Sequence, residues 1–442
     1  MSVAIPTGTF DILPQDPKEQ WRNSHLWQFV ESVIRDHAKV YGCEEIRTPM
    51  FERTELFCRS VGDATDIVSK EMYTFLDRGE RSMSLRPEGT AAVMRSFIEK
   101  GLQSQSSVHR LFYLAPMFRY ERPQSGRFRQ HHQFGVEVIG ASQPELDAEL
   151  IEMLYTLYEK LGLKNLKVLV NSLGDKSARQ LFRSNLQSYL QPHLAHMSDE
   201  SKHRFEVNPL RILDSKDERD IEIVKGAPSI LDFLTPESNA HFARVQSILS
   251  HLKIPYEINS KLVRGLDYYN NTVFEITSSH LGAQNSLAGG GRYDGLMKSL
   301  GGQDLPTIGF GAGIERMIQA LLNQSHLVPE RPRPALYIIP LGPEAVGPCF
   351  TLARYLRLGG TVCLVDHSGK KLKNAMQQAD NLRAEYVIIL GENELKMGTC
   401  ELKEMASGQR MQLAIDAVPL FFKTRNLNTS TIAPQSHIEH GK

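Results

Sequence analysis

The sequence predicts an α+β fold followed by a smaller α/β domain. Two strand-like segments, at 110–120 and 130–139, are joined by a polar loop and followed by an amphipathic helical pattern at about 142–162. Beyond a proline-bearing linker, apolar strands such as 336–339 and 386–390 alternate with helical stretches, which is the pattern of a small α/β domain. We therefore expect one large mixed domain with a compact domain behind it.

The first predicted element is a helix that begins near residue 16. Asp16 is a suitable N-cap, Pro17 suits the first helical position, and Glu19 stands where a capping box places its acid. Apolar residues then recur at helical spacing until Gly42. The stretch 45–49 is predicted as a short strand that ends at a proline. A subunit contact and an ordinary core helix explain this pattern equally well.

The middle of the chain is predicted as an interrupted core domain. The stretch from about 172 to 255 is more polar and more helical, and we interpret it as an inserted subdomain. Strand-like residues 272–278 and the glycines 289–291 resume the first domain. The predicted domains are a core at 1–325, a linker at 326–334, an α/β domain at 335–425 and a flexible tail at 426–442.

The composition is typical of a soluble globular protein. Of the 442 residues, 41% are hydrophobic and 23% are charged, and no run of 18 apolar residues occurs, so we expect no membrane span. The N-terminus lacks a secretion signal, and five scattered cysteines without a C-x-x-C pair favour reduced thiols in the cytoplasm. Basic and acidic residues balance at 51 each, which disfavours a non-specific nucleic-acid binder but allows local positive charge.

Four charged or glycine-rich segments lack the amphipathic periodicity of a structural element. The first, 85–90, is by itself more often a solvated turn. The second is 117–129 with the strand that follows it. Its loop carries Arg122, Arg127 and Arg129 but no lysine, which favours a polyphosphate site because guanidinium forks match phosphate oxygens. The alternative is an exposed, salt-bridged hairpin.

The third segment, 264–269, places two tyrosines beside an arginine and an aspartate. Alone it could be a half-buried turn in which Arg264 pairs with Asp267 or another local carboxylate. The fourth combines 288–295 with 309–316. We interpret its glycines as turns that let a ligand approach the backbone, followed by a helix N-terminus that favours anions. Each such turn is weak evidence by itself.

Together the four segments resemble the motif set of histidyl-tRNA synthetases, in order and approximate spacing. Motif 2 corresponds to 118–137, the two histidine-specific motifs to 264–269 and 289–296, and motif 3 to 309–316, while 16–49 resembles the motif 1 dimer contact. The resemblance covers about 5–425. It implies a class II core with a mostly antiparallel sheet and flanking helices, an anticodon-binding α/β domain, and a homodimeric ligase that uses ATP and Mg²⁺ to charge tRNA(His).

The resemblance also implies roles for individual residues. Histidine would be bound by Glu88, Gly89, Thr90, Gln133, Glu137, Arg264, Tyr268, Tyr269 and Tyr293. ATP would be bound by Arg119, Glu121, Arg127, His131 and Arg316. The catalytic candidates are Arg119, Arg264 and Arg316, with Arg264 at the α-phosphate. Arg122 and Gln124 would meet the tRNA acceptor end, and Glu121 would lie near the adenine or a magnesium ion, with no metal ligand assigned firmly.

One residue departs from the family pattern. His131 stands where the family usually has a phenylalanine that stacks on adenine, so the geometry and pH dependence of that contact are open. The implied reaction itself makes chemical sense. The substrate carboxylate, with a pKa of about 3.5, is ionised at neutral pH and needs no general base. Positioning and neutralisation of phosphate charge therefore suffice.

Three other functions are alternatives. A paralogue that regulates histidine biosynthesis would share the core but lose the catalytic arginines, the 264–269 segment or the C-terminal domain, all of which this chain keeps. A class II synthetase for another amino acid would be distinguished by Glu137 and the Tyr268–Tyr269 pair. A plain nucleic-acid-binding module would not need arginines around a phosphate site. Lys370, Lys371, Lys373 and Arg383 outweigh Asp380 in the C-terminal domain, which predicts tRNA phosphate contacts there.

Overall fold

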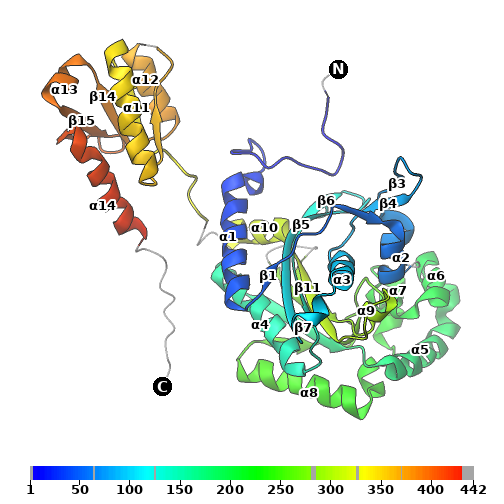
Figure 1. Ribbon diagram of the computed structural model, residues 1–442. Coiled ribbons are helices and arrows are strands. Elements are labelled where there is room, and N and C mark those ends of the chain that lie inside the picture. Colours follow the sequence, from blue (N-terminus) through cyan, green and yellow to red (C-terminus); the bar gives the residue numbers. More distant parts are fainter. Residues whose placement is uncertain are drawn as a thin grey trace. The chain divides into compact units, whose positions relative to one another are not determined.

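The computed structural model describes residues 3–62, 65–123, 126–279, 285–324, 328–369 and 371–430. The chain divides into two compact units, Met1–Pro329 and Glu330–Lys442. Each unit has its own sheet and its own buried core (Figure 1). Among the described helices, none has both the length and the apolar character needed to cross a membrane.

The first unit is built on an eight-stranded sheet in the order β1-β5-β6-β11-β10-β9-β7-β8. Its strands are β1 (Glu44–Glu45), β5 (His109–Phe118), β6 (Gln130–Ile139), β7 (Leu166–Ser172), β8 (Tyr256–Ile258), β9 (Asn270–Ser278), β10 (Ser286–Arg292) and β11 (Thr307–Gly313). The pairs from β5 through β7 are antiparallel, and only the two edge strands β1 and β8 pair in parallel. The fold is therefore α+β with a mostly antiparallel sheet, as predicted.

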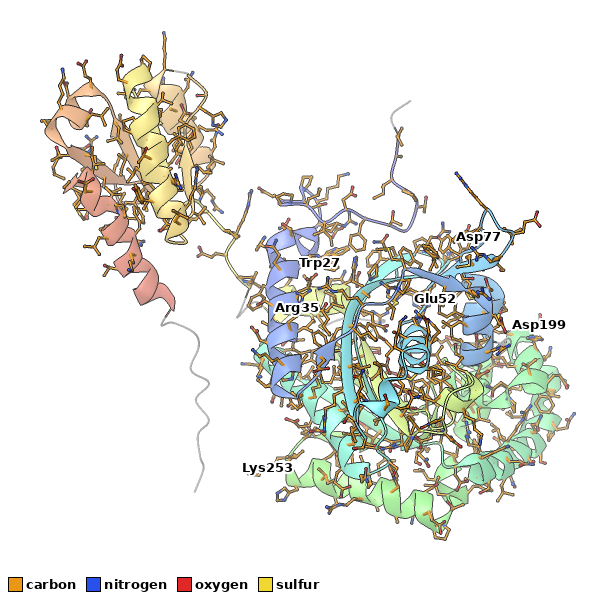
Figure 2. The ribbon with its side chains drawn as sticks, in the orientation of Figure 1. Trp27, Arg35, Glu52, Asp77, Asp199 and Lys253 are labelled. Carbon is orange, nitrogen blue, oxygen red and sulfur yellow. The ribbon has the colours of Figure 1, made fainter. Side chains whose placement is uncertain are left out.

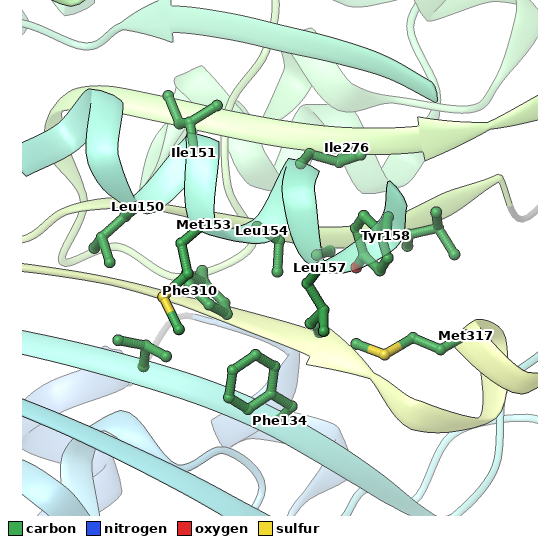
Figure 3. Packing of buried hydrophobic residues seen from close by; sticks show 14 of the residues in the cluster. Phe134, Leu150, Ile151, Met153, Leu154, Leu157, Tyr158, Ile276, Phe310 and Met317 are labelled. Atoms are coloured by element: carbon green, nitrogen blue, oxygen red, sulfur yellow. The ribbon is translucent and has the colours of Figure 1, made fainter. Parts of the chain in front are cut away.

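One face of this sheet is covered by the long helices α1 (Ser24–Val40), α4 (Pro144–Lys160) and α10 (Ile314–Gln324), and α8 (Pro236–His251) packs on α4. Because successive strand residues point to opposite faces, every second residue of β6 enters this core. Phe134 of β6 meets Phe310 of β11 edge to face, with ring centroids 5.3 Å apart. Figure 3 shows α4 lying over these rings with Met153 and Leu154 directed at them.

The opposite face packs against α3 (Thr90–Glu99), α9 (Leu296–Ser299) and the helices of the insertion. The insertion follows β7 and contains α5 (Lys176–Leu190), α6 (Asp199–Val207), the 3-10 segment η5 (Pro209–Asp214) and α7 (Glu218–Lys225). Asp199 marks the start of α6 in Figure 2. A small sheet, β2 (Phe51–Arg53), β4 (Ser82–Leu85) and β3 (Thr74–Leu76), lies beside α2 (Thr54–Val61).

The second unit is a five-stranded sheet with helices, in the order β13-β12-β14-β15-β16. The strands are β12 (Leu336–Pro340), β13 (Cys363–Val365), β14 (Tyr386–Leu390), β15 (Thr399–Glu404) and β16 (Arg410–Ala414). The first three in sheet order are parallel, which requires crossover helices. The helices are α11 (Pro343–Leu358), α12 (Leu372–Asn381), α13 (Glu392–Met397) and α14 (Val418–Ser430).

Two local predictions near the start of the chain need correction. Asp16 does accept hydrogen bonds from the N–H groups of Lys18 and Glu19, but α1 begins only at Ser24. The chain first forms a single 3-10 turn that buries Trp21, whose carbonyl accepts from the Trp27 indole at 2.9 Å. The strand expected at 45–49 is only Glu44–Glu45, and beyond it the carbonyls of Thr48 and Pro49 accept from the Arg86 side chain instead of a strand.

The other corrections concern ends of elements. The strand predicted at 110–120 ends at Phe118, so Arg119 and Glu121 lie in the loop beyond it. The tail predicted from 426 is helical through Ser430 as part of α14, and residues 431–442 lie outside the described chain. The five cysteines are free thiols, as expected.

Candidate active site

The glycines interpreted as turns lie inside two central strands, which corrects that prediction for all but Gly295, which lies in a turn before α9. Gly289 belongs to β10 and Gly311 to β11, and they pair with each other and with Gly135 of β6. These three glycines form one row of the sheet, flanked by Tyr113 of β5 and Glu275 of β9. A row of glycines leaves one face of the sheet without side chains. We call this row, Gly135, Gly311 and Gly289, the glycine floor.

Functional side chains occupy the space that the glycine floor leaves open. A Cβ atom at Gly289 would collide with the Arg264 guanidinium, one at Gly311 with Gln133, and one at Gly135 with the Tyr113 ring. Gly309, one row away, makes the same allowance for Glu137 and Tyr293. The glycines are therefore required for close approach within strands, and turns are not involved.

A cavity of about 390 Å³ opens above the glycine floor. Its lining includes six arginines and five carboxylates: Arg119, Arg127, Arg204, Arg211, Arg264, Arg316, Asp66, Glu71, Glu121, Asp214 and Glu315. His131 and Gln133 also line it. The structure thus brings together most of the predicted ATP residues and the predicted catalytic arginines in one cavity.

Each of the predicted catalytic arginines uses only some of its N–H donors in hydrogen bonds within the protein. Arg119 donates Nε–H to the Pro87 carbonyl at 2.8 Å. Arg316 donates to the carbonyls of Ser286 and Gly126, at 2.6 and 3.2 Å. Arg264 donates from Nη1 to Glu275 at 3.1 Å, so the local pairing with Asp267 that the sequence suggested is wrong. A guanidinium has five N–H donors, so each keeps donors that can reach a ligand in the cavity.

A second cluster of predicted residues surrounds the carboxylate of Glu137, which is fully buried. The Thr90 hydroxyl donates to its Oε1 at 2.8 Å and the Tyr113 hydroxyl at 3.4 Å, while the Tyr293 hydroxyl donates to Oε2. Burial raises the pKa of Glu137 well above its ordinary value, and the Glu88 carboxylate raises it further. A buried carboxylate with a raised pKa favours a cationic or N–H donating ligand beside it.

Glu88 is the other buried carboxylate of this cluster. It accepts the backbone N–H groups of Thr90 and Ala91, at 2.7 and 2.9 Å, at the first turn of α3. Burial nevertheless raises its pKa. Gly89 lies between Glu88 and Thr90, and a Cβ atom there would collide with the ring of Tyr113. Residues 88–90 are thus folded tightly against β5 and β6, which makes them part of the site and excludes the solvated turn.

Three tyrosines close the cluster. The rings of Tyr268 and Tyr269 lie 4.7 Å apart between centroids, and each contacts the ring of Tyr293, at 5.2 and 5.9 Å. Burial raises the pKa of Tyr268 and of Tyr269, so all their hydroxyls remain protonated donors at neutral pH. Tyr293 is fully buried.

His131 lines the cavity as a neutral imidazole. Burial lowers its pKa to about 3, and the cations Arg119 and Arg316 lower it as well. Its neighbour His132 is held by Glu315, which accepts the backbone N–H at 2.7 Å and contacts the ring Nδ1 at 2.9 Å. The ring of His131 therefore presents a flat, uncharged surface between two arginines.

Of the two residues predicted at the tRNA acceptor end, only Arg122 lies within the described chain. Arg122 is exposed on the loop after β5 and is not among the cavity residues. Gln124 lies outside the described residues. Within the part of the chain that the structure describes, no group of three or more His, Cys, Asp or Glu side chains is arranged to hold a metal ion.

Sequence reasoning missed several residues of the site. Tyr113 bridges Gln133 and Glu137 by hydrogen bonds of 3.3 and 3.4 Å, and its position opposite Gly135 in the predicted strand pair was the signal for it. Arg204, Arg211 and Asp214 reach the cavity from the insertion. No pattern in the sequence of the insertion distinguishes these three residues from solvated charges.

Comparison with known proteins agrees with this geometry. The family model "Histidyl-tRNA synthetase" matches residues 8–317, and the model "Anticodon binding domain" matches residues 335–425. The histidine–tRNA ligase of Protochlamydia amoebophila is 58% identical over 94% of this chain and 98% of its own length, and that of Bacillus subtilis is 46% identical over 94% and 97%.

A solved structure supports the same conclusion. The apo histidyl-tRNA synthetase of S. aureus superposes with a TM-score of 0.80 at 36% identity, over 96% of this chain and all of that chain. Both units of this chain thus have counterparts in the same relatives, in the same order. The alternative of a regulatory paralogue is not favoured by these relatives. The chain belongs to the histidyl-tRNA synthetase family.

Proposed function

We propose that this chain activates L-histidine with ATP to histidyl-adenylate and then transfers the histidyl group to the 3' end of tRNA(His). The observation that carries the proposal is the buried Glu137, surrounded by hydroxyl donors, directly beside a cavity lined by six arginines. The first feature suits a small cationic amino acid, and the second suits a polyphosphate.

In the proposed complex, Glu137 accepts an imidazole N–H and a tyrosine hydroxyl from the Tyr268, Tyr269 and Tyr293 cluster meets the other ring nitrogen. Imidazole has one donor and one acceptor nitrogen when neutral, so two unlike partners distinguish it from other side chains. Glu88, Thr90 and Gln133 hold the ammonium group. An amino acid that leaves this many buried polar groups without partners would be rejected strongly.

Arg119, Arg127 and Arg316 hold the ATP phosphates in the proposal, with the neutral ring of His131 against the adenine. Mg²⁺ would accompany the phosphates and neutralise part of their charge. Glu71 and Glu121 fit such an ion, because both carboxylates line the cavity and the charge of Glu121 contributes to the raised pKa of Glu71. A cation near the pair would relieve that repulsion.

The chemistry of activation needs no side-chain nucleophile. A carboxylate oxygen of histidine forms a bond to the α-phosphorus of ATP, and the bond from that phosphorus to the diphosphate oxygen breaks. Negative charge grows on the non-bridging oxygens of the α-phosphate, and Arg264 stabilises it from its place over Gly289. Preorganised cations of this kind lower the barrier more than they tighten binding of the ground state.

The second unit is proposed to bind the tRNA anticodon, and Arg122 and Gln124 to meet the acceptor end. We also propose a homodimer that forms through the first unit near residues 16–49. Its support is the cluster of exposed apolar side chains on the small sheet, Met50, Phe51, Phe75 and Leu76. Sedimentation at micromolar concentration should give about twice the chain mass of 49.9 kDa. A fully active monomer would refute this assembly.

ATP–pyrophosphate exchange measured with each of the amino acids tests the main proposal. Histidine alone should support exchange, and addition of purified tRNA should then yield histidyl-tRNA. Exchange with another amino acid would place the chain elsewhere among the class II enzymes. No exchange with any amino acid would favour the regulatory paralogue instead.

A further inference from the structure

The segment that carries Arg264 and Tyr269 has no helix or strand of its own between β8 and β9. Its geometry therefore depends on side chains from elsewhere that bond to its backbone. From the core, Asn171 donates to the Leu262 carbonyl at 3.0 Å. From α2, the Val61 carbonyl accepts the Asp267 N–H at 3.5 Å, and the insertion supplies further anchors.

Two arginines of the insertion donate hydrogen bonds to backbone carbonyls of this segment. Arg179 on α5 donates Nη1–H to the Tyr269 carbonyl at 2.8 Å. Arg211 on η5 donates Nη2–H to the Gly265 carbonyl. Between them, Asn208 donates to the Asp267 carboxylate at 2.8 Å, and the Nε of Arg211 lies 3.4 Å from the same carboxylate.

These two arginines are not ordinary surface cations. The side chain of Arg211 is only 11% exposed, and burial lowers the pKa of Arg179. Arg211 also reaches Asp66, at 3.7 Å, in the loop that forms another wall of the catalytic cavity. A guanidinium taken partly out of water needs protein acceptors in place of the lost solvent, so each arginine restrains the backbone that it contacts.

Gly265 shows why such anchoring is needed next to Arg264. A Cβ atom at Gly265 would meet nothing within 4 Å, so no side-chain packing restrains this residue. Glycine also has more backbone freedom than any other residue. The bond from Arg211 therefore restrains the peptide that follows Gly265, one residue beyond Arg264.

We propose that the insertion is part of the histidine-activating machinery, with Arg211 and Arg179 as positioning residues for Arg264 and Tyr269. The proposal rests on the function proposed above and deepens it. An insertion that served tRNA alone would be silent in a reaction without tRNA. Here its two half-buried arginines set the geometry of adenylate formation itself, because a misplacement of about 1 Å costs up to 10²-fold in rate.

The test is ATP–pyrophosphate exchange without tRNA, on the full-length protein carrying Arg211→Gln or Arg179→Gln. Arg211→Gln should lower kcat by about 10- to 100-fold with a small change in the KM for ATP, because it acts at the Arg264 end. Arg179→Gln should chiefly raise the KM for histidine, because it acts at the Tyr269 end. Arg219→Gln is the matched control, since this exposed arginine of the insertion pairs with Asp217 beside it.

A double variant separates positioning from general damage. If Arg211 acts through Arg264, Arg211→Gln combined with Arg264→Ala should be no slower than Arg264→Ala alone. Rate losses that multiply would overturn the proposed coupling. Arg211→Lys keeps a cation with a single contact and should recover part of kcat, which provides a readout if Arg211→Gln folds poorly.

The outcomes also distinguish the positioning role from the proposed function on which it rests. Wild-type protein without histidine-dependent exchange would refute the proposed function. Wild-type exchange together with normal exchange in both single variants, and a loss only in tRNA charging, would refute the positioning role and leave the function intact. Melting temperatures measured beside the rates identify any loss that follows unfolding.

Discussion

Replacing Arg264 by alanine separates a catalytic role from a structural one. Arg264 lies over Gly289 with its guanidinium toward the cavity and one ion pair to Glu275, at 3.1 Å. The two side chains of the pair are 23% and 21% exposed, so water screens part of their attraction. An ion pair this exposed contributes about 1 kcal/mol or less to folding.

The two roles predict different magnitudes. A preorganised donor to a developing anionic oxygen is worth about 10²–10³ in rate, or roughly 2.7–4 kcal/mol. Loss of the Glu275 pair alone would lower the melting temperature by no more than about 4 °C. The Arg264→Ala protein should therefore remain folded at 25 °C while adenylate formation slows by two to three orders of magnitude, about 10²–10³.

Pre-steady-state adenylation measured beside the melting temperature decides between them. We expect kcat to fall and the KM for ATP to change little, which is the pattern of lost transition-state stabilisation. Glu275→Gln is the matched control, because it removes the same ion pair and leaves the cation in the cavity. A normal adenylation rate in Arg264→Ala, or equal losses in both variants, would refute the catalytic role.

Three further outcomes are expected. Glu137→Gln should raise the KM for histidine more than that for ATP in the exchange assay, because it removes the charge beside the imidazole; an unchanged histidine KM would make Glu137 a structural residue. Burial raises the pKa of Glu88 and of Glu137 in the free protein. A bound ammonium group lowers both pKa values again. Histidine binding should therefore release protons, and it should become tighter as the pH rises through the raised pKa values. Calorimetric titrations in two buffers of unlike ionisation enthalpy, above the imidazole pKa of about 6.5, measure this release, and proton uptake would contradict it. Truncation near Val328 should weaken tRNA charging more than histidine activation, because Lys371, Lys373 and Arg383 lie in the second unit; equal losses in a folded truncated protein would contradict the division of roles.

Much of the fold was predictable because it follows local patterns. Strands β5 and β6 and helix α4 lie within about two residues of their predicted bounds, since alternation and helical periodicity are properties of neighbouring residues. The glycines were misassigned for a physical reason. A glycine in a strand centre and a glycine in a turn have the same sequence signature, and only the pairing of β10 with β11 shows which is present.

The candidate site likewise contains residues that local sequence patterns identify and residues that they do not. Residues 119–137 and 264–269 were identified because their chemistry is concentrated in short segments. Arg179 and Arg211 were not, because their acceptors lie 90 and 54 residues further along the chain. The partner of Arg264 was wrong for a related reason. Asp267 is nearer in sequence, but it is already bound by Asn208 and Arg211, and Glu275 faces Arg264 across the glycine floor.

The glycine floor also determines which packing contacts stabilise the candidate site. Glycine has little intrinsic preference for a strand and brings no side chain of its own to pack on the sheet. The layer on the opposite face, Phe134 and Phe310 with Met153 and Leu154 of α4, therefore supplies much of the packing that holds β10 and β11 in place. A mutation that weakens the packing of α4 would therefore disorder the glycine floor, even with every side chain that faces the cavity unchanged. The side of the sheet remote from the substrates is thus as vulnerable to mutation, or to a small molecule, as the cavity itself.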